Sequence, residues 1–152
     1  MLRYFLENDL VNITDKHPKD WKEAIRVSGE VLKKNNLITD QYIDQVIADV
    51  EEYGPYIVIV PGVAMPHSSA KNEGVLGTGI GFTIMPEKIS FDENDREKDA
   101  KLFFMLAAKD SSTHVQNIAN LSDMLMEDGM IDDLMKIKTM GDYHEVMKKH
   151  NM

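Results

Sequence analysis

The chain has 152 residues, 43% of them hydrophobic, and a formal charge of −9 at pH 7. This length and apolar content are enough for one folded unit, so we expect a single domain over residues 1–152. The acidic balance argues against binding to nucleic-acid phosphates, and the absence of cysteine excludes thiolate chemistry, cysteine-ligated zinc and iron–sulfur clusters.

The sequence also predicts a cytoplasmic location. Its N-terminal residues lack the apolar core and the cleavage site of a signal peptide, and the longest apolar run, near residues 56–63, is too short to span a bilayer. A chain without cysteine also fits a reducing compartment.

Strand and helix signals alternate along the first half of the chain. Residues 10–14 alternate apolar and polar side chains, which predicts a short strand. A helix is expected over residues 20–36, with Asp20 as its N-cap, and a second one over residues 39–54. Residues 56–60 form a continuous β-branched run, which is typical of a strand buried on both faces.

The second half of the chain predicts further strands followed by helices. Strand patterns cover residues 75–84 and 102–108, with a short strand at 89–91. Thr113 and Gln116 have the spacing of a capping box, which predicts a helix that places His114 at its first position. Two more helices follow, over 131–137 and 143–149, so the whole pattern indicates a mixed α/β sandwich.

His67 and His114 stand at positions that suit chemistry. His67 directly follows Pro66 after a strand and turn, beside the small residues 68–70, and sites gather at the ends of strands in α/β sheets. His114 stands near the start of a helix, where free N–H groups and the helix dipole attract anions such as phosphate. Neutral imidazole is a good nucleophile near pH 7, so one histidine could carry a group that the other stabilises.

Each histidine also has an ordinary interpretation. A Pro-His pair after a strand is often a loop residue, and a histidine near a helix start often has no special role. The two residues lie 47 positions apart and show no metal-ligand spacing, so neither a metal nor a cofactor is predicted. The glycine-rich run 77–81 opens no helix, and the acidic run 92–99 lacks the glycine and glutamate of a calcium loop, so both are rejected.

Two longer stretches resemble a known family. Residues 53–67, which end in Ala64-Met65-Pro66-His67, resemble the active-site stretch of enzyme IIA domains of the sugar phosphotransferase system, mannitol/fructose superfamily. Residues 106–114 are similar to the second motif of that family, which ends in its second histidine. The Tyr-Gly-Pro-Tyr form at 53–56 is similar to the ascorbate-type branch, and the resemblance covers nearly the whole chain.

The resemblance implies a phosphocarrier with a mixed, mostly parallel β-sheet of about five strands sandwiched between helices. His67 would accept a phosphoryl group from the histidine phosphocarrier protein and pass it to a cysteine of enzyme IIB. The membrane enzyme IIC would couple transfer to uptake of ascorbate or a related pentose or pentitol. His114 would hydrogen-bond the phosphoryl group without being phosphorylated itself.

One departure and three open points accompany the resemblance. The mannitol-type branch has a phosphate-binding arginine in the helix before the first motif, whereas residues 48–52 contain none. A stand-alone regulatory module, controlled by its phosphorylation state, is the alternative to a transport role, and a purely structural domain is a third reading. Homo-oligomer formation stays open because no interface signal is present.

Overall fold

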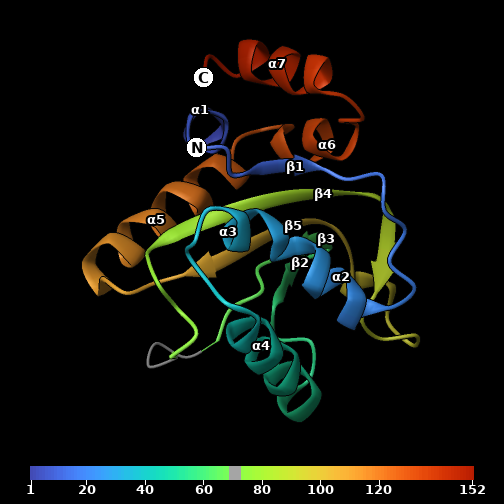
Figure 1. Cartoon of the computed structure of the whole chain (residues 1–152). Helices are drawn as coiled ribbons and strands as arrows, with labels where there is room; N and C mark the ends of the chain where they lie inside the picture. Colours follow the sequence, from blue (N-terminus) through green and yellow to red (C-terminus); the bar gives the residue numbers. More distant parts are fainter. Residues whose placement is uncertain (69–72) are drawn as a thin grey trace.

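The computed structural model describes residues 1–68 and 73–152 (Figure 1). In these two segments, strands form one five-stranded sheet in the order β1-β4-β5-β3-β2. The strands are β1 (Val11–Ile13), β2 (Val58–Val60), β3 (Gly62–Ala64), β4 (Gly79–Ser90) and β5 (Asp99–Ala107). The helices are α1 (Leu2–Glu7), α2 (Trp21–Ser28), α3 (Glu30–Lys34), α4 (Asp40–Tyr53), α5 (Ser111–Leu125), α6 (Met130–Met135) and α7 (Met140–Lys149), and one 3₁₀ turn spans Arg96–Lys98.

The expected mixed α/β fold is confirmed, but the sheet is evenly mixed rather than mostly parallel. Strand β1 pairs with β4 and β3 with β5 in parallel, whereas β4–β5 and β2–β3 are antiparallel. The reason lies in the connections. Only Pro61 separates β2 from β3, and only the 3₁₀ turn and its flanks separate β4 from β5, and such short links allow antiparallel pairing alone.

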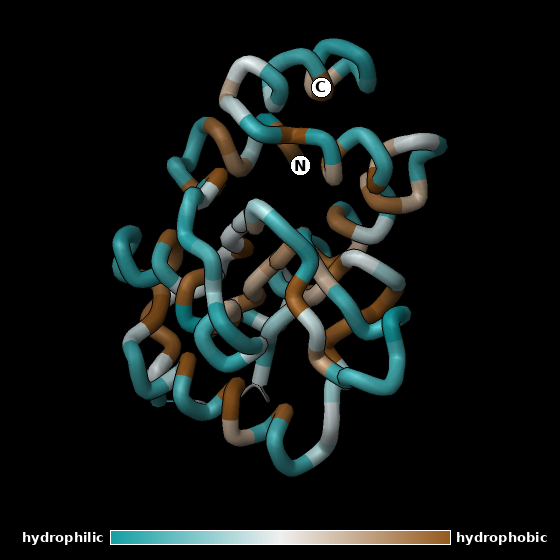
Figure 2. Tube along the Cα trace, turned by 90° about the vertical axis from the view of Figure 1, so that its right-hand side faces the viewer, coloured by the Kyte–Doolittle hydropathy of each residue, from teal (hydrophilic) through white to brown (hydrophobic). Residues whose placement is uncertain are grey.

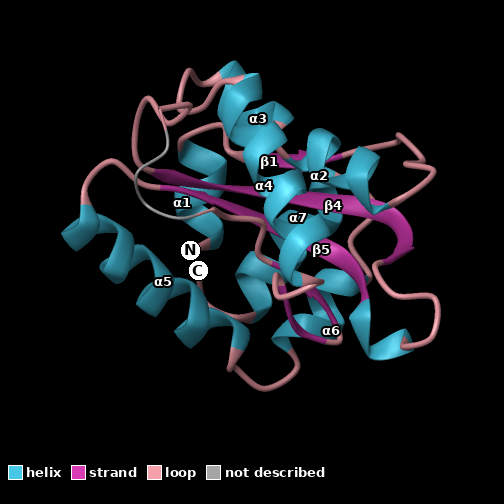
Figure 3. Ribbon diagram, turned by 90° about the horizontal axis from the view of Figure 1, so that it is seen from below, coloured by secondary structure: helices cyan, strands magenta, loops and turns pink. Residues whose placement is uncertain are grey.

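Helices cover both faces of this sheet (Figures 1 and 3). On one face, the rings of Phe82 and Phe104 stack across β4 and β5 with centroids 4.3 Å apart, and Phe5 of α1 packs against both. Tyr143 of α7 joins this cluster and donates a hydrogen bond from its hydroxyl to the carbonyl of Leu2 at 2.7 Å. The first and last helices are therefore joined through one aromatic cluster.

On the opposite face, α3 packs closely on Gly81 of β4. A side chain at position 81 would overlap Val31 and Leu32 of this helix. Helix α7, next to the C-terminus, is mostly hydrophilic in Figure 2, and its buried side carries Tyr143, Val146 and Met147. Among the described residues, no helix combines the length and apolar character needed to cross a membrane.

Several predicted elements differ in detail from the observed ones. Helix α1 was not predicted, although Leu2 and Phe5 are both fully buried. The expected helix at 20–36 is divided into α2 and α3 around Gly29, and its predicted cap is confirmed because Asp20 accepts a hydrogen bond from the N–H of Glu23 at 2.9 Å.

The strand predictions changed most at the edge of the sheet. The run at 56–60 was expected to be buried on both faces, but only 58–60 form β2, and Ile59 and Val60 remain 45% and 40% exposed because β2 is an edge strand. The predicted strand at 75–84 begins at Gly79, and residues 89–90 continue it as part of β4.

Gly62, which opens β3, should not tolerate a side chain. Its φ is +91°, and an added Cβ would overlap the methyl group of Met135. We expect Gly62→Ala to lower the free energy of unfolding by about 1–3 kcal/mol. Gly141→Ala is the matched control, because its Cβ meets nothing nearer than the Thr139 hydroxyl at 3.5 Å and alanine favours a helix. Equal denaturant midpoints for wild type and Gly62→Ala would contradict this account.

Candidate functional site

The site is built on the segment that follows β3. The N–H of Met65 donates to the carbonyl of Ile57 at 2.8 Å, and the carbonyl of Pro66 accepts from the N–H of Leu106 in β5 at 3.0 Å. Because the parallel pairing of β3 with β5 ends here, these two bonds carry the chain past the end of the sheet in a fixed position. His67 is the next residue.

The His67 ring has one nitrogen committed to the backbone. Its Nδ1 lies 2.6 Å from the carbonyl oxygen of Met65. Because a carbonyl can only accept, Nδ1 must carry the proton, and in the neutral ring Nε2 then carries the lone pair. The local backbone therefore selects the tautomer in which Nε2 is the nucleophilic nitrogen.

The peptide unit that follows His67 is held by two tyrosine hydroxyls. Tyr56 donates to the carbonyl of His67 at 2.7 Å, and Tyr42 accepts from the N–H of Ser68 at 3.2 Å while it donates to the carbonyl of Leu106 at 2.5 Å. Burial is the main cause that raises the pKa of each tyrosine to about 12, so both hydroxyls stay protonated near neutral pH.

His114 lines the same cavity as His67, and its position in the helix differs from the prediction. Helix α5 begins at Ser111 with Asp110 as its N-cap, so the predicted capping box at Thr113 is wrong and His114 occupies the fourth helical position. The hydroxyl of Thr113 instead donates to the Asp110 carboxylate. This carboxylate already occupies the helix N-terminus that the sequence offered as an anion site.

The electrostatics of His114 favour a neutral ring. Burial lowers its pKa below the usual 6.5, and the charge of nearby His67 lowers it further. A neutral imidazole near pH 7 still has one N–H to donate. The two predicted histidines, 47 positions apart in the sequence, are neighbours in the structure because both line one cavity.

The two histidines line one small cavity of about 50 Å³. Its other lining residues are Tyr42, Ser68, Val75, Leu106 and Ala108. This space holds a few water-sized groups but is far smaller than the roughly 300–1,000 Å³ of pockets that enclose small organic ligands. The site can therefore accommodate a small group attached to a histidine, not a bound sugar.

A carboxylate from α4 reaches the same loop. The hydroxyl of Ser68 donates to one oxygen of Asp49 at 2.5 Å, and the amide of Gln45 donates to the other at 2.8 Å. Residues 48–52 thus supply an acid rather than an arginine to the loop that carries His67. Ser69 and Ala70, which were expected to leave room beside His67, lie outside the described residues.

Sequence reasoning missed Tyr42, Tyr56 and Asp49 as parts of the site. Tyr42 could not be distinguished from the apolar stripe of its helix, in which it is 2% exposed. Within the described ranges, no group of three or more histidine, aspartate or glutamate side chains is arranged to hold a metal ion.

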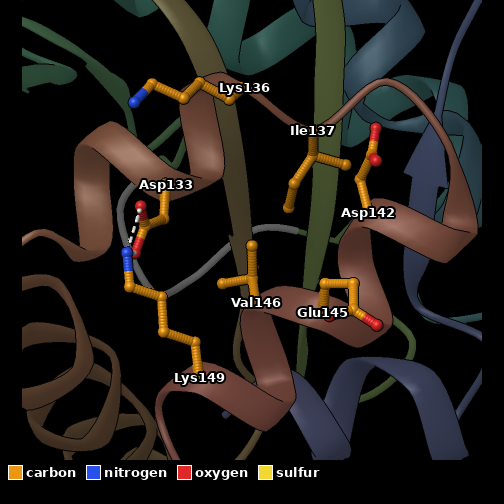
Figure 4. Close-up of a pocket in the computed structure, with 7 residues that line it drawn as sticks. All are labelled: Asp133, Lys136, Ile137, Asp142, Glu145, Val146 and Lys149. Atoms are coloured by element: carbon orange, nitrogen blue, oxygen red, sulfur yellow. Dashed lines mark hydrogen bonds and ion pairs between the residues drawn. The ribbon is translucent and has the colours of Figure 1, made fainter.

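A larger cavity of about 300 Å³ lies between α6 and α7 (Figure 4). Figure 4 shows Asp133 and Lys149 pointing toward each other, and their charged atoms are 3.1 Å apart. The carboxylate of Asp133 also lies 2.8 Å from Nε2 of His150. The charges of Asp133, Lys149 and His150 are therefore paired with one another beside this cavity.

Comparison with known proteins points to one family. Residues 4–150 match the family model "Phosphoenolpyruvate-dependent sugar phosphotransferase system, EIIA 2". The chain is 35% identical over 132 residues to the mannitol-specific cryptic phosphotransferase enzyme IIA component of Escherichia coli K12, covering 87% of this chain and 86% of that protein. It is 26% identical over 132 residues to the ascorbate-specific PTS system EIIA component of the same strain, covering 86% and 84%.

Solved structures agree with this result. The solution structure of the mannitol-specific cryptic enzyme IIA CmtB from Escherichia coli superposes with a TM-score of 0.79 and 31% identity, covering 97% of each chain. A complex of enzyme IIAMTL and phosphorylated enzyme IIBMTL from Escherichia coli shares the fold, with a TM-score of 0.74, 23% identity and coverage of 93% and 95%. Both mannitol and ascorbate names occur, so the comparisons do not single out the ascorbate-type branch.

The lowered pKa of His114 predicts a pH dependence. Because its folded-state pKa lies below the unfolded value near 6.5, the unfolded chain binds the proton first, and stability is lost as pH falls from about 6.5 toward the folded pKa. In an NMR titration we expect His114 to titrate below 6.5. In the His67→Gln variant, the pKa of His114 should rise but stay below 6.5, because burial is the larger cause of the lowered pKa. A His114 pKa at or above 6.5 in the wild type would contradict this picture.

Proposed function

The chain belongs to the EIIA type 2 family of the phosphoenolpyruvate-dependent sugar phosphotransferase system, and on that premise we propose that it carries a phosphoryl group on Nε2 of His67. The observation that supports this most directly is the 2.6 Å contact between Nδ1 and the Met65 carbonyl. It keeps a proton on Nδ1 and leaves a lone pair on the other nitrogen. The cavity beside the ring is the size of a small group.

The transfer itself needs little from the protein beyond position and charge. The bond from phosphorus to the donor's histidine nitrogen breaks as the bond to Nε2 of His67 forms, and the donor nitrogen keeps the electron pair it gains. Nδ1 keeps its proton throughout and donates it in the hydrogen bond to the Met65 carbonyl, so no proton needs to leave the site. Phosphoryl transfer is catalysed largely by positioning and by stabilising charge on the equatorial oxygens.

His114 is the proposed stabiliser of that charge. It lines the same cavity as His67, and its lowered pKa keeps the ring neutral with one N–H available. A hydrogen bond from this N–H to a phosphoryl oxygen is charge-assisted and stronger than a neutral one. Asp49 and Asp110 bring negative charge to the surrounding loops. Because residues 48–52 supply no arginine to offset it, the hydrogen bond from His114 contributes more to stabilising the phosphoryl group.

The proposed partners follow the family. The phosphorylated histidine phosphocarrier protein is the donor, and a cysteine of enzyme IIB is the acceptor, with the membrane enzyme IIC coupled to it. The structure of enzyme IIAMTL with phosphorylated enzyme IIBMTL supports a IIB partner. The sugar is proposed to be ascorbate, a related pentose or pentitol, or mannitol. The cavity beside His67 has no room for a sugar, so the choice is made elsewhere in the system.

A regulatory module is the alternative. It would use the same phosphorylation of His67, but the phosphorylated state would change partner binding instead of feeding transport. The two functions differ in one measurable respect, since only a transport component passes its phosphoryl group rapidly to a IIB cysteine.

Phosphotransfer in vitro tests the proposal. Purified protein is incubated with phosphoenolpyruvate, enzyme I and the histidine phosphocarrier protein, and the products are examined by mass spectrometry. We expect one acid-labile phosphoryl group on the wild type and none on His67→Ala. His114→Ala should still accept the group, but roughly 10- to 100-fold more slowly, because one hydrogen bond to a charged group is lost.

His144, an exposed residue of α7, provides the matched control. His144→Ala should accept the phosphoryl group as the wild type does. A phosphoryl group that persists in His67→Ala would show that another residue is the carrier. An unmodified wild type would contradict the phosphocarrier function altogether.

A further inference from the structure

We propose that Tyr42 and Tyr56 are positioning residues, whose hydroxyls hold the peptide unit between His67 and Ser68 and so keep the His67 ring directed into the cavity it shares with His114. This inference rests on the proposed function, since it assigns the residues that prepare His67 for transfer. Neither tyrosine needs to touch the phosphoryl group.

The two hydroxyls hydrogen-bond to the carbonyl oxygen and to the N–H of a single peptide unit. Tyr56, in the turn before β2, donates to the carbonyl of His67 at 2.7 Å, and Tyr42, on α4, accepts from the N–H of Ser68 at 3.2 Å. A peptide unit is planar and rigid, so directional hydrogen bonds to both its oxygen and its N–H restrain the orientation of the plane. That orientation sets the backbone angle at His67, from which the imidazole projects.

Tyr42 also ties this unit to the sheet. Its own proton is directed to the carbonyl of Leu106 at 2.5 Å, which leaves an oxygen lone pair facing the N–H of Ser68. The N–H of Leu106 donates to the carbonyl of Pro66 at 3.0 Å. Leu106 thus anchors the residue before His67 directly and the residue after it through Tyr42, so His67 is held from both sides by one position of β5.

The ring of Tyr56 restrains the imidazole as well. Its centroid lies 5.4 Å from that of His67, with the two planes at 88°, an edge-to-face arrangement. Together with the hydrogen bond of Nδ1 to Met65, this contact limits rotation of the His67 ring. A nucleophile held in place before the reaction loses less entropy when the donor arrives.

Tyr56 allows positioning to be separated from stability. Its side chain belongs to a residue that is 38% exposed, and its hydroxyl hydrogen-bonds to a loop carbonyl at the site, not to a core element. Tyr56→Phe keeps the ring contact and removes only the hydroxyl. Tyr53→Phe is the matched control, because Tyr53 is 71% exposed and its hydroxyl makes no hydrogen bond within the described part of the chain.

The first experiment measures transfer from the phosphorylated histidine phosphocarrier protein. Loss of one hydrogen bond corresponds to about a two- to tenfold change. We expect Tyr56→Phe and Tyr42→Phe each to lower kcat by this factor with little change in KM, whereas Tyr53→Phe matches the wild type. Because both hydroxyls act on one peptide unit, the double variant should lose less than the product of the two single effects.

The second measurement needs no phosphoryl donor. Long-range ¹H–¹⁵N NMR of the unmodified proteins reports which His67 nitrogen carries the proton. The wild type and Tyr53→Phe should show Nδ1–H, and Tyr56→Phe should show a larger share of the other tautomer. Melting temperatures are recorded for every variant. If Tyr42→Phe fails to fold, the comparison of Tyr56→Phe with Tyr53→Phe alone tests the proposal.

The outcomes separate the two proposals. A wild type that accepts no phosphoryl group contradicts the proposed function, and the NMR comparison still tests positioning. A wild type that transfers normally, with Tyr56→Phe and Tyr42→Phe equal to Tyr53→Phe in kcat and in His67 tautomer, overturns the positioning role and leaves the phosphocarrier function intact.

Discussion

The hydrogen bond between Nδ1 of His67 and the carbonyl of Met65 is the interaction on which the site depends. It determines which ring nitrogen is free, and it is a local contact, because Met65 stands only two residues before His67. Pro66 restricts the backbone between Met65 and His67, and the pairing of β3 with β5 fixes the point at which this segment leaves the sheet. The fold therefore selects the free nitrogen of His67 through a backbone carbonyl, while the hydroxyls of Tyr42 and Tyr56 hydrogen-bond to the peptide unit that follows the histidine.

The parallel pairing of β3 with β5 has a second consequence. Parallel neighbours end at the same edge of a sheet, so the loop that carries His67 and the turn that leads into α5 lie side by side. His114 is carried to the cavity by α5 in this way, although nearly a third of the chain separates the two histidines. Thr78 strengthens this arrangement, because its hydroxyl accepts from the N–H groups of Lys109 and Asp110 at 2.8 and 3.0 Å.

The sequence could predict the class of fold and could single out His67 and His114 as candidates, because both depend on local patterns and on motifs with fixed spacing. It could not predict which groups surround them. Tyr42 belongs to the apolar stripe of α4, and only the three-dimensional structure shows that its hydroxyl reaches Leu106 and Ser68. The sequence also could not predict that β2 lies at the edge of the sheet, because a β-branched run occurs in edge strands and in central strands.

The central claim is that Nε2 of His67 carries the phosphoryl group, and ¹⁵N–³¹P NMR of the phosphorylated protein tests it most directly. With the histidine rings labelled with ¹⁵N, the account predicts a single phosphohistidine at position 67, with phosphorus coupled to Nε2 and a proton retained on Nδ1. Coupling of phosphorus to Nδ1 would contradict it, because that nitrogen could not then donate to the carbonyl of Met65.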